Sequence, residues 1–248
     1  MSDAPPSGGP VSKEFIADLA AASRVLADEG VVDAAGHVSQ RHPDVPDRYF
    51  MSRAMAPALV TPDDIIEFTL DSDPCDASAP AGSLERFIHG EIYKARPDVN
   101  SVVHSHSPSV IPFGLVETKM QAMFHMAAFL TRGVPVFDIR EKFGTTDILV
   151  SDPSKGVAFA ACLGDKDVAL MRAHGSTACG ATLQSAVFHA VYTEVNARVQ
   201  HWTQALSGGG PMALLDQEEG RLADAINQGA RLRAWELWRQ RVREETGW

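Results

Sequence analysis

The chain has 248 residues, of which 45% are hydrophobic and 22% are charged, and its formal net charge at pH 7 is -10. This length and composition suit one large α/β domain or two small ones, and the sequence has no low-complexity block and no internal repeat. The acidic balance, without a dense run of Lys or Arg, argues against nucleic acid or an anionic membrane as a partner. No apolar stretch reaches the roughly 20 residues that cross a bilayer, so we expect a cytoplasmic protein without a membrane partner.

The N-terminal segment 1–12 is rich in proline and glycine and offers almost nothing to bury, so it predicts a disordered arm. From residue 13 to about 29 the apolar residues recur at helical spacing, and Gly30 stands where a helix end favours glycine. Short apolar runs at 31–38, 49–52 and 65–70, separated by Pro, Asp and Gly, predict strands. Ser83 then precedes a one-sided apolar stripe that Pro97 ends, which predicts a helix of about three turns.

The segment NSVVHSHS, at 100–107, predicts a strand that ends in two histidines. The segment DPSKGVAFAACLG, at 152–164, predicts a helix capped by Asp152, with Pro153 in its first turn and Gly164 at its end. A strand from 168 leads to His174 and Gly175, and an amphipathic helix follows from 182 to about 206. After SGGGP, a last helix is expected at about 216–246, so strands and helices alternate as in a layered α/β domain.

Three histidines in this pattern are candidate metal ligands. Residues two apart on a strand point to the same face, so His104 and His106 can present ring nitrogens to one point. His174 follows a strand and precedes Gly175, where the chain can turn and leave the imidazole free. Neutral imidazoles with open coordination positions are typical of catalytic zinc and related ions, and Glu85 can add a carboxylate nearby. An HxH pair on a strand is, however, more often structural than catalytic, and the order of these elements is what favours metal binding.

The segments that carry these residues resemble the class II aldolase/adducin superfamily. They are GHVSQRHP, SLERFIHGEIYKARPDVNSVVHSHS and VALMRAHGSTACGATLQSAVF, and the resemblance covers about residues 13 to 206. It implies a catalytic domain at 13–206, followed by a helical extension at 207–248. It also implies a three-layer α/β/α fold around a mainly antiparallel nine-stranded sheet, and a homotetramer with active sites at subunit boundaries.

The same resemblance implies functional roles for four residues. His104, His106 and His174 correspond to the histidines that bind one divalent ion, and Glu85 to the glutamate that acts as acid and base. Zinc or manganese is favoured, with cobalt, iron and magnesium as alternatives, because three imidazoles select weakly among these ions. Adducin-like members of the superfamily have the fold without catalysis, so a non-catalytic scaffold is one alternative.

The substrate expectation depends on positions where the chain departs from the sugar-phosphate aldolases. In those enzymes an Asn, a Thr-Gly pair and two Ser residues bind the phosphate. This chain has His37, Arg53-Ala54 and Ser83-Leu84 at those positions. Arg53, and Arg86 beside Glu85, carry planar forks of donors that suit a carboxylate, and His37 adds a donor or a positive charge. A solvated surface role is at least as plausible for Arg86. The sequence therefore favours a small-molecule carboxylate over a phosphate ester.

The pattern MSRxxAPxLVTPDDI, with VVHSHSPSVIPFG and FHM, is similar to a decarboxylase branch of the superfamily that acts on hydroxylated aromatic or pyridine carboxylates. We therefore expect a metal-dependent lyase of this kind, in which Glu85 or His125 protonates the ring carbon. His125 has the alternative role of a packed core residue. An aldolase that cleaves a non-phosphorylated hydroxy acid is the competing activity.

Overall fold

The computed structural model describes residues 4–248 and contains one mixed sheet with helices on both faces. The strands are β1 (His37–Arg41), β2 (Arg48–Ser52), β3 (Ile65–Thr69), β4 (Ser101–Ser105), β5 (Val136–Phe137), β6 (Val168–Met171) and β7 (Gly175–Gly180). The α-helices are α1 (Lys13–Asp28), α2 (Arg86–Ala95), α3 (Arg140–Phe143), α4 (Pro153–Leu163), α5 (Leu183–Ser207) and α6 (Gln217–Thr246). A 3₁₀ segment, η4 (His125–Arg132), precedes β5.

The order of strands across the sheet is β3-β2-β1-β4-β7-β6-β5. Every pairing is antiparallel except that of β5 with β6, so the predicted mainly antiparallel α/β class is confirmed. The expected count of nine strands is wrong for the described residues, which form seven. The apolar run at 31–38 is mostly irregular, because Gly36 has a φ of +108° and pairing begins only at His37, where β1 starts.

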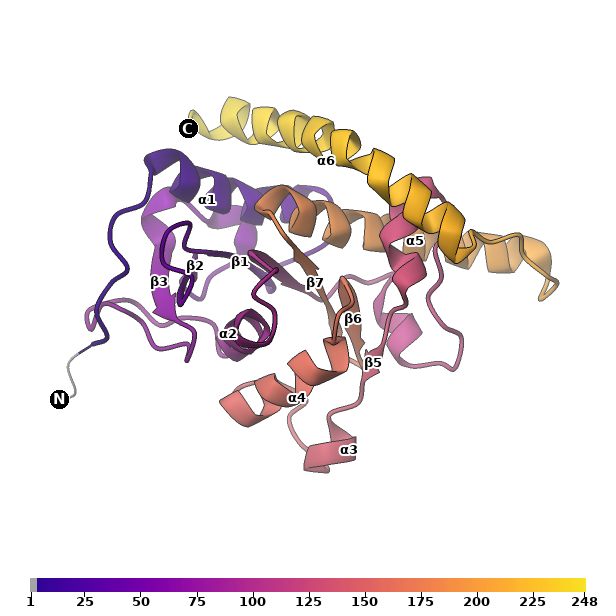
Figure 1. Cartoon of the computed structure of the whole chain (residues 1–248), viewed down its shortest axis with the longest axis horizontal. Coiled ribbons are helices and arrows are strands. Elements are labelled where there is room, and N and C mark those ends of the chain that lie inside the picture. Colours follow the sequence, from indigo (N-terminus) through magenta and orange to yellow (C-terminus); the bar gives the residue numbers. More distant parts are fainter. Residues whose placement is uncertain (1–3) are drawn as a thin grey trace.

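Side chains along β4 point alternately to the two faces of the sheet, and each face packs against a different layer of helices. Val102 belongs to a core formed with α2 and α4, and Val103 to a core formed with α1, α5 and α6, because successive residues of a strand face opposite sides. Figure 1 shows the same arrangement, with α1, α5 and α6 over one face and α2 and α4 over the other. The side chain of His104 lies on the same face as that of Val102, toward α2.

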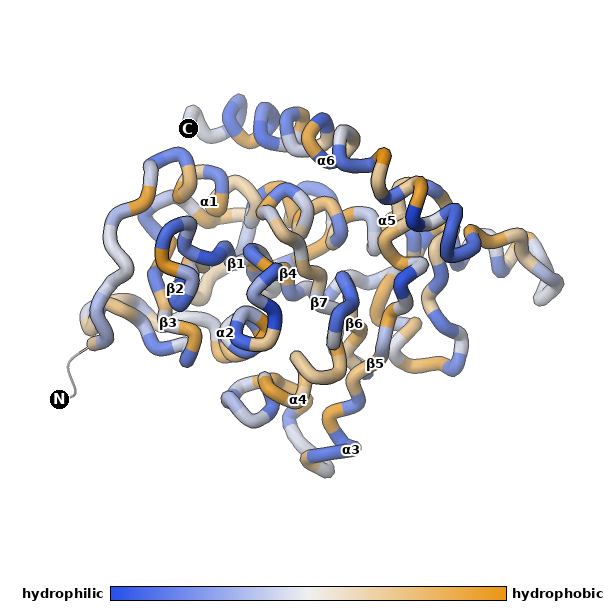
Figure 2. Tube along the Cα trace, in the orientation of Figure 1, coloured by the Kyte–Doolittle hydropathy of each residue, from blue (hydrophilic) through white to orange (hydrophobic). Residues whose placement is uncertain are grey.

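The helix boundaries follow from capping side chains. Asp152 accepts a hydrogen bond from the Lys155 amide at the start of α4, and Thr182 accepts one from Ser185 at the start of α5. These bonds satisfy amides that have no partner inside a helix, which explains why both starts were predictable. The last helix, α6, is largely hydrophilic (Figure 2). Two of its residues, Trp235 and Trp238, are nevertheless buried in the core shared with α1 and α5.

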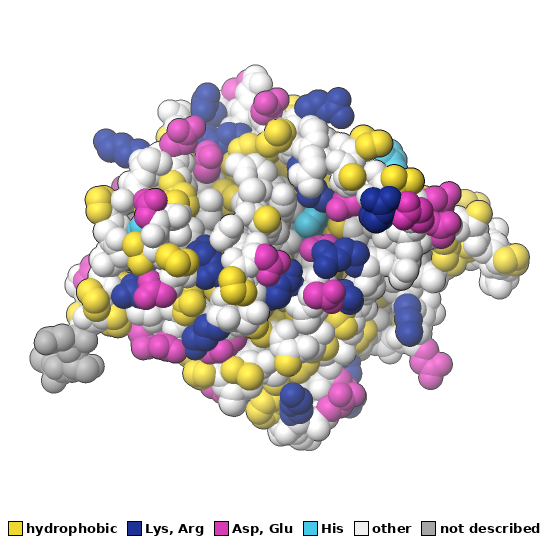
Figure 3. Space-filling view, viewed as in Figure 1, with side chains coloured by type: hydrophobic (Ala, Val, Ile, Leu, Met, Phe, Trp, Pro, Cys, Tyr) yellow, Lys and Arg dark blue, Asp and Glu magenta, His cyan; other side chains and the backbone are white. Residues whose placement is uncertain are grey.

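The N-terminal segment from residue 4 to Ser12 forms no helix or strand. Its Gly8 amide donates to Glu67 Oε1 at 2.7 Å, and the Pro6 carbonyl accepts from Arg48, so these residues lie along β2 and β3. The first three residues of the predicted arm lie outside the described part of the chain. Within that part, no helix has the length and apolar character needed to span a membrane. On the face in Figure 3, acidic and basic side chains are interspersed.

Candidate metal centre and adjoining pocket

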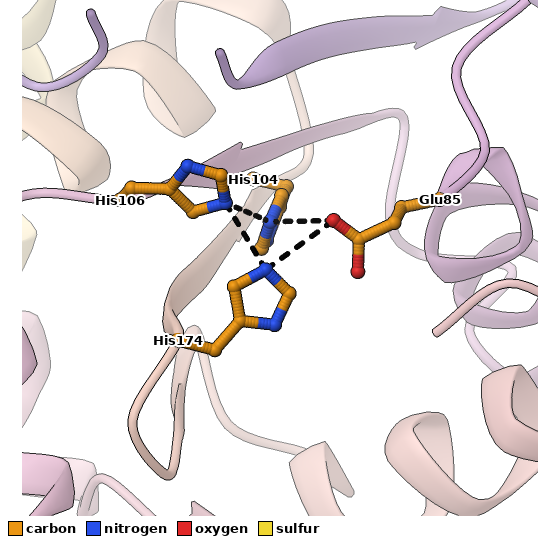
Figure 4. Close-up of side chains that lie close together, drawn as sticks. All are labelled: Glu85, His104, His106 and His174. Carbon is orange, nitrogen blue, oxygen red and sulfur yellow. Dashed lines mark hydrogen bonds and ion pairs between the residues drawn. The ribbon is translucent and has the colours of Figure 1, made fainter. Parts of the chain in front are cut away.

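Four side chains from three parts of the fold converge at one end of the central strands. His104 lies in β4, His106 directly follows that strand, His174 lies in the turn between β6 and β7, and Glu85 is the N-cap of α2. One potential ligand atom from each lies within 4.8 Å of the others, and Figure 4 shows the side chains pointing toward one another. The structure thus brings together the four residues that the sequence singled out, and we call these four candidate ligands of a single ion the metal cluster.

The spacing of these atoms suits a single ion. His106 Nε2 lies 3.2 Å from His104 Nε2 and 3.0 Å from His174 Nε2, while Glu85 Oε2 lies 3.4 and 3.3 Å from the Nε2 atoms of His104 and His174. Two ligands that each lie about 2.0–2.1 Å from one zinc ion are about 2.9–3.4 Å apart, for angles between a right angle and the tetrahedral value. The residues therefore fit a divalent ion.

Contacts behind the cluster orient its members. The Ile148 carbonyl accepts a hydrogen bond from His174 Nδ1 at 3.1 Å, so in the neutral ring the Nε2 lone pair faces the cluster. Ile148 has a φ of 61°, which is unfavourable for a β-branched residue and places local backbone strain beside the site. The Val150 amide donates to Glu85 Oε1 at 2.9 Å, which leaves Oε2 for the imidazoles.

The turn that carries His174 depends on close backbone approach. Ala173 has a φ of 55°, in the left-handed region, and Gly175 begins β7 directly after the histidine. A Cβ added at Gly175 would lie 2.0 Å from the Ser105 carbonyl oxygen, so only glycine lets β7 approach β4 here. This contact sets His174 opposite His106.

Charge in the cluster is distributed in a way that favours a cation. Burial, reinforced by His104 and His174, lowers the pKa of His106 to about 4, so this ring is neutral near pH 7 and its lone pair is available. Burial acts to raise the pKa of Glu85, but charge and hydrogen bonding from His104 and His174 outweigh it and hold that pKa well below its usual range. Glu85 is therefore a carboxylate at neutral pH.

A pocket of about 390 Å³ opens beside the cluster. It is lined by segments 34–37, 52–56 and 83–85, together with His106 and Leu149. Arg53 reaches it, and its Nε donates to Asp64 Oδ1 at 2.7 Å while its terminal nitrogens make no hydrogen bond to the described residues. A larger cavity of about 570 Å³, between η4 and the start of α6, contains none of the cluster residues.

The other predicted substrate and proton-donor residues lie in different places. His37 lines the pocket, and its ring centroid is 5.1 Å from that of His104. Arg86 does not line it, because Nε donates to the Ser72 carbonyl and the guanidinium stacks on Phe87. His125 is exposed at the start of η4, and no contact within the described residues joins it to the cluster.

A buried residue that the sequence argument missed, His89, lies behind His37. Its Nε2 is 2.7 Å from His37 Nδ1, and its Nδ1 is 2.6 Å from Ser39 Oγ. Burial holds the pKa of His37 well below its usual range and lowers that of His89 to about 3, so both rings are neutral. Sequence spacing could have revealed His89, because it follows Glu85 by four residues and thus shares a helix face with it.

Comparisons with known proteins show which family and fold the chain shares. Residues 17–201 match the family described as Class II Aldolase and Adducin N-terminal domain. The chain is 36% identical over 244 residues to "Decarboxylase tropJ" of Talaromyces stipitatus, across 90% of this chain and 91% of that protein. It is 27% identical to a 3,4-dihydroxyphthalate decarboxylase of Arthrobacter keyseri, again across 90% and 91%. An aldolase II superfamily protein from Pseudomonas syringae shares the fold, with a TM-score of 0.80 at 20% identity and coverage of 96% and 95%.

Proposed function

The chain belongs to the class II aldolase and adducin N-terminal domain family, and from this premise we propose that it is a divalent-metal-dependent decarboxylase of a hydroxylated aromatic or pyridine carboxylic acid. The observation that carries the proposal is that one pocket joins the metal cluster to Arg53, a donor for a planar anion. The names of the two decarboxylase relatives support the same reaction class.

His104, His106 and His174 would hold the ion, and zinc or manganese suits three imidazoles. A bound divalent ion supplies a Lewis acid that stabilises the negative charge left when the bond to the carboxylate breaks. The neutral state of His106 and the fixed ring of His174 keep lone pairs available for it.

Glu85 would carry the proton. As a carboxylate it first takes the proton of the substrate hydroxyl, and the carbon-carbon bond then breaks, releasing carbon dioxide and leaving the electron pair on the ring. The same Glu85 returns its proton to that ring carbon, and the deprotonated hydroxyl regains a proton from solvent on release. The overall reaction consumes one proton for each carbon dioxide formed, and it needs no oxidant.

Arg53 and His37 would bind the acid groups of the substrate. Asp64 holds Arg53 through Nε, and Asp64 is itself held by the Thr61 amide and hydroxyl, so the guanidinium is fixed with its terminal nitrogens free. Met55 and Leu149 offer apolar surface for a ring. Arg86 has no part in this proposal, and His125 would act only if a neighbouring subunit of the proposed homotetramer brought it to the pocket.

A substrate panel tests the reaction. Metal-loaded protein would be incubated with dihydroxybenzoic, dihydroxyphthalic and hydroxypyridine carboxylic acids, and carbon dioxide and aldehyde or pyruvate would be assayed separately. We expect carbon dioxide from at least one acid and none from the metal-free protein. Aldehyde release from a hydroxy acid, without carbon dioxide from the panel, would favour the aldolase alternative.

Arg53 provides a sharper version of this test. Replacing it by Met should raise KM for the decarboxylated acid at least about tenfold, since a charge-assisted bond contributes about 1.5–3 kcal/mol, while metal content stays unchanged. Arg48→Met is the matched control, because Arg48 contacts Pro6 and lies outside the pocket.

Protein that binds no stoichiometric metal and turns over no acid would support the scaffold alternative. Light scattering tests the tetramer.

A further inference from the structure

A line of four hydrogen-bonded side chains runs from the pocket into the space between β1 and α2, and we call it the His37 chain. His37 Nδ1 lies 2.7 Å from His89 Nε2, His89 Nδ1 lies 2.6 Å from Ser39 Oγ, and Ser39 Oγ lies 2.7 Å from the Tyr93 hydroxyl. Ser39 and His89 have 0% of their surface exposed and Tyr93 has 1%. Only His37 reaches the pocket.

The inner end of the chain fixes its direction. The buried Tyr93 hydroxyl carries one hydrogen, and Ser39 Oγ is the only acceptor that it contacts among the described residues. Burial raises the pKa of Tyr93, so the hydroxyl keeps that hydrogen. If Ser39 donated to Tyr93 instead, the phenol hydrogen would be buried without a partner, which costs about 1–3 kcal/mol. Tyr93 therefore donates to Ser39.

Each later bond follows from the one before it. Ser39 has a single hydroxyl hydrogen, and with Tyr93 donating to it, the remaining partner for that hydrogen is His89 Nδ1. A neutral imidazole carries one hydrogen, so His89 has it on Nε2 and donates it to His37 Nδ1. His37 Nδ1 is then an acceptor, and the hydrogen of His37 lies on Nε2.

We propose that this chain holds His37 in one tautomer, with Nε2–H available to the pocket as a neutral hydrogen-bond donor. His89, Ser39 and Tyr93 are positioning residues that act through His37. A neutral donor avoids placing a second positive charge beside the divalent ion, and it favours ligands that offer an oxygen acceptor there. The use of this donor to bind an acid group rests on the proposed function, whereas the tautomer itself does not.

Solid-state NMR of the wild-type protein, labelled with ¹⁵N-histidine and loaded with zinc, tests the tautomer directly. The signals of His37 are identified by their absence in His37→Gln. We expect a protonated Nε2 and an unprotonated Nδ1, with Nδ1 coupled to the hydrogen on His89. A hydrogen on Nδ1, or on both nitrogens at pH 7, would overturn the proposal. Because this readout needs no turnover, it stands apart from the substrate panel.

Variants test whether the inner residues set this state. Ser39→Ala removes the donor to His89, so the hydrogen of His37 should distribute over both nitrogens, and kcat/KM should fall about tenfold at unchanged metal content, as expected for one lost hydrogen bond. Tyr49→Phe is the matched control, because it deletes another buried hydroxyl, which bonds to Ser72. A Ser39→Ala protein with the wild-type tautomer would contradict the role of the chain. If that variant fails to fold, the wild-type spectrum still decides.

Discussion

Two groups of histidines lie side by side in this fold, the His37 chain and the metal cluster, and the ring centroids of His37 and His104 are 5.1 Å apart. Within each group, the distances between ring nitrogens are similar. In the His37 chain, His37 Nδ1 lies 2.7 Å from His89 Nε2. In the metal cluster, His106 Nε2 lies 3.0 Å from His174 Nε2 and 3.2 Å from His104 Nε2. The two groups nevertheless present different atoms to their neighbours, because the second nitrogen of each ring has a different hydrogen-bond partner. A carbonyl behind His174 turns a lone pair toward its neighbours, whereas a hydroxyl behind His89 turns a hydrogen toward His37. The partner behind each ring thus distinguishes a proposed metal ligand, which presents a lone pair, from a proposed hydrogen-bond donor.

The largest expected effect comes from removing ligands. His104→Ala combined with His106→Ala should abolish stoichiometric metal and reduce turnover at least about a thousandfold, since a Lewis acid contributes several kcal/mol. Elemental analysis and the carbon dioxide assay measure this. His201→Ala, which changes a half-buried histidine outside the cluster, is the control. Turnover by a metal-free double variant would refute the ligand assignment.

Glu85→Gln removes the negative charge of this side chain and keeps its size. The amide can still accept from the Val150 amide, but it cannot take up a proton, so kcat should fall about 10²–10³-fold while the protein stays folded. Steady-state kinetics on metal-loaded protein measures the loss. Glu91→Gln changes a buried glutamate of the same helix that pairs with Lys94, and it should retain most activity. Equal kinetics for the two variants would exclude Glu85 as the proton carrier.

Gly175→Ala tests whether backbone approach sets the cluster. The new Cβ would meet the Ser105 carbonyl oxygen, so we expect the free energy of unfolding to fall by about 1–3 kcal/mol and metal affinity to weaken. Denaturant unfolding and metal titration measure the two effects. Gly229→Ala in α6 is the control, because a Cβ there meets nothing within 4 Å and alanine favours a helix. A fully stable variant with unchanged affinity would show that the strands adjust.

The last expected effect concerns pH and belongs to the His37 chain. The pKa of His89 is lowered to about 3, against about 6.5 in the unfolded chain, so acidification between these values protonates only the unfolded state. Metal-free protein should therefore lose stability as pH falls below 6.5, with His89 contributing roughly 2–3 kcal/mol of that loss at pH 4.5. His89→Gln should lose less stability over the same range. Parallel pH profiles for both proteins would contradict a neutral buried His89.

Local signals made part of this structure predictable. Asp152 and Thr182 each cap a helix by accepting a hydrogen bond from the amide three residues later in the chain. The sequence prediction placed both helices correctly. The metal cluster was also foreseeable, because strand alternation constrains His104 and a His-Gly pair marks a turn. The resemblance to a known family suggested the proposed role of Glu85, which sequence spacing alone could not indicate.

Long-range contacts explain the rest. The Ile148 carbonyl that orients His174 is 26 residues away in sequence, and Ser39 meets His89 across 50 residues, so no local pattern records either bond. Arg86 illustrates the converse, because the carbonyl of Ser72, 14 residues earlier in the chain, draws it away from the pocket that its neighbour Glu85 reaches. Strand boundaries depend on backbone pairing, and β1 begins only at His37, after Gly36 with its positive φ.

Helix α2 carries Glu85 at its start, His89 one turn later and Tyr93 one turn beyond that. The proposed proton carrier and the residues proposed to orient His37 thus lie on one helix, and a shift of that helix would disturb both roles together. Segments 34–36 and 53–56 also line the pocket and contain neither the metal cluster nor the inner residues of the His37 chain. We therefore expect substitutions that adapt the pocket to other acids to fall in those two segments, and few substitutions at the pocket end of α2.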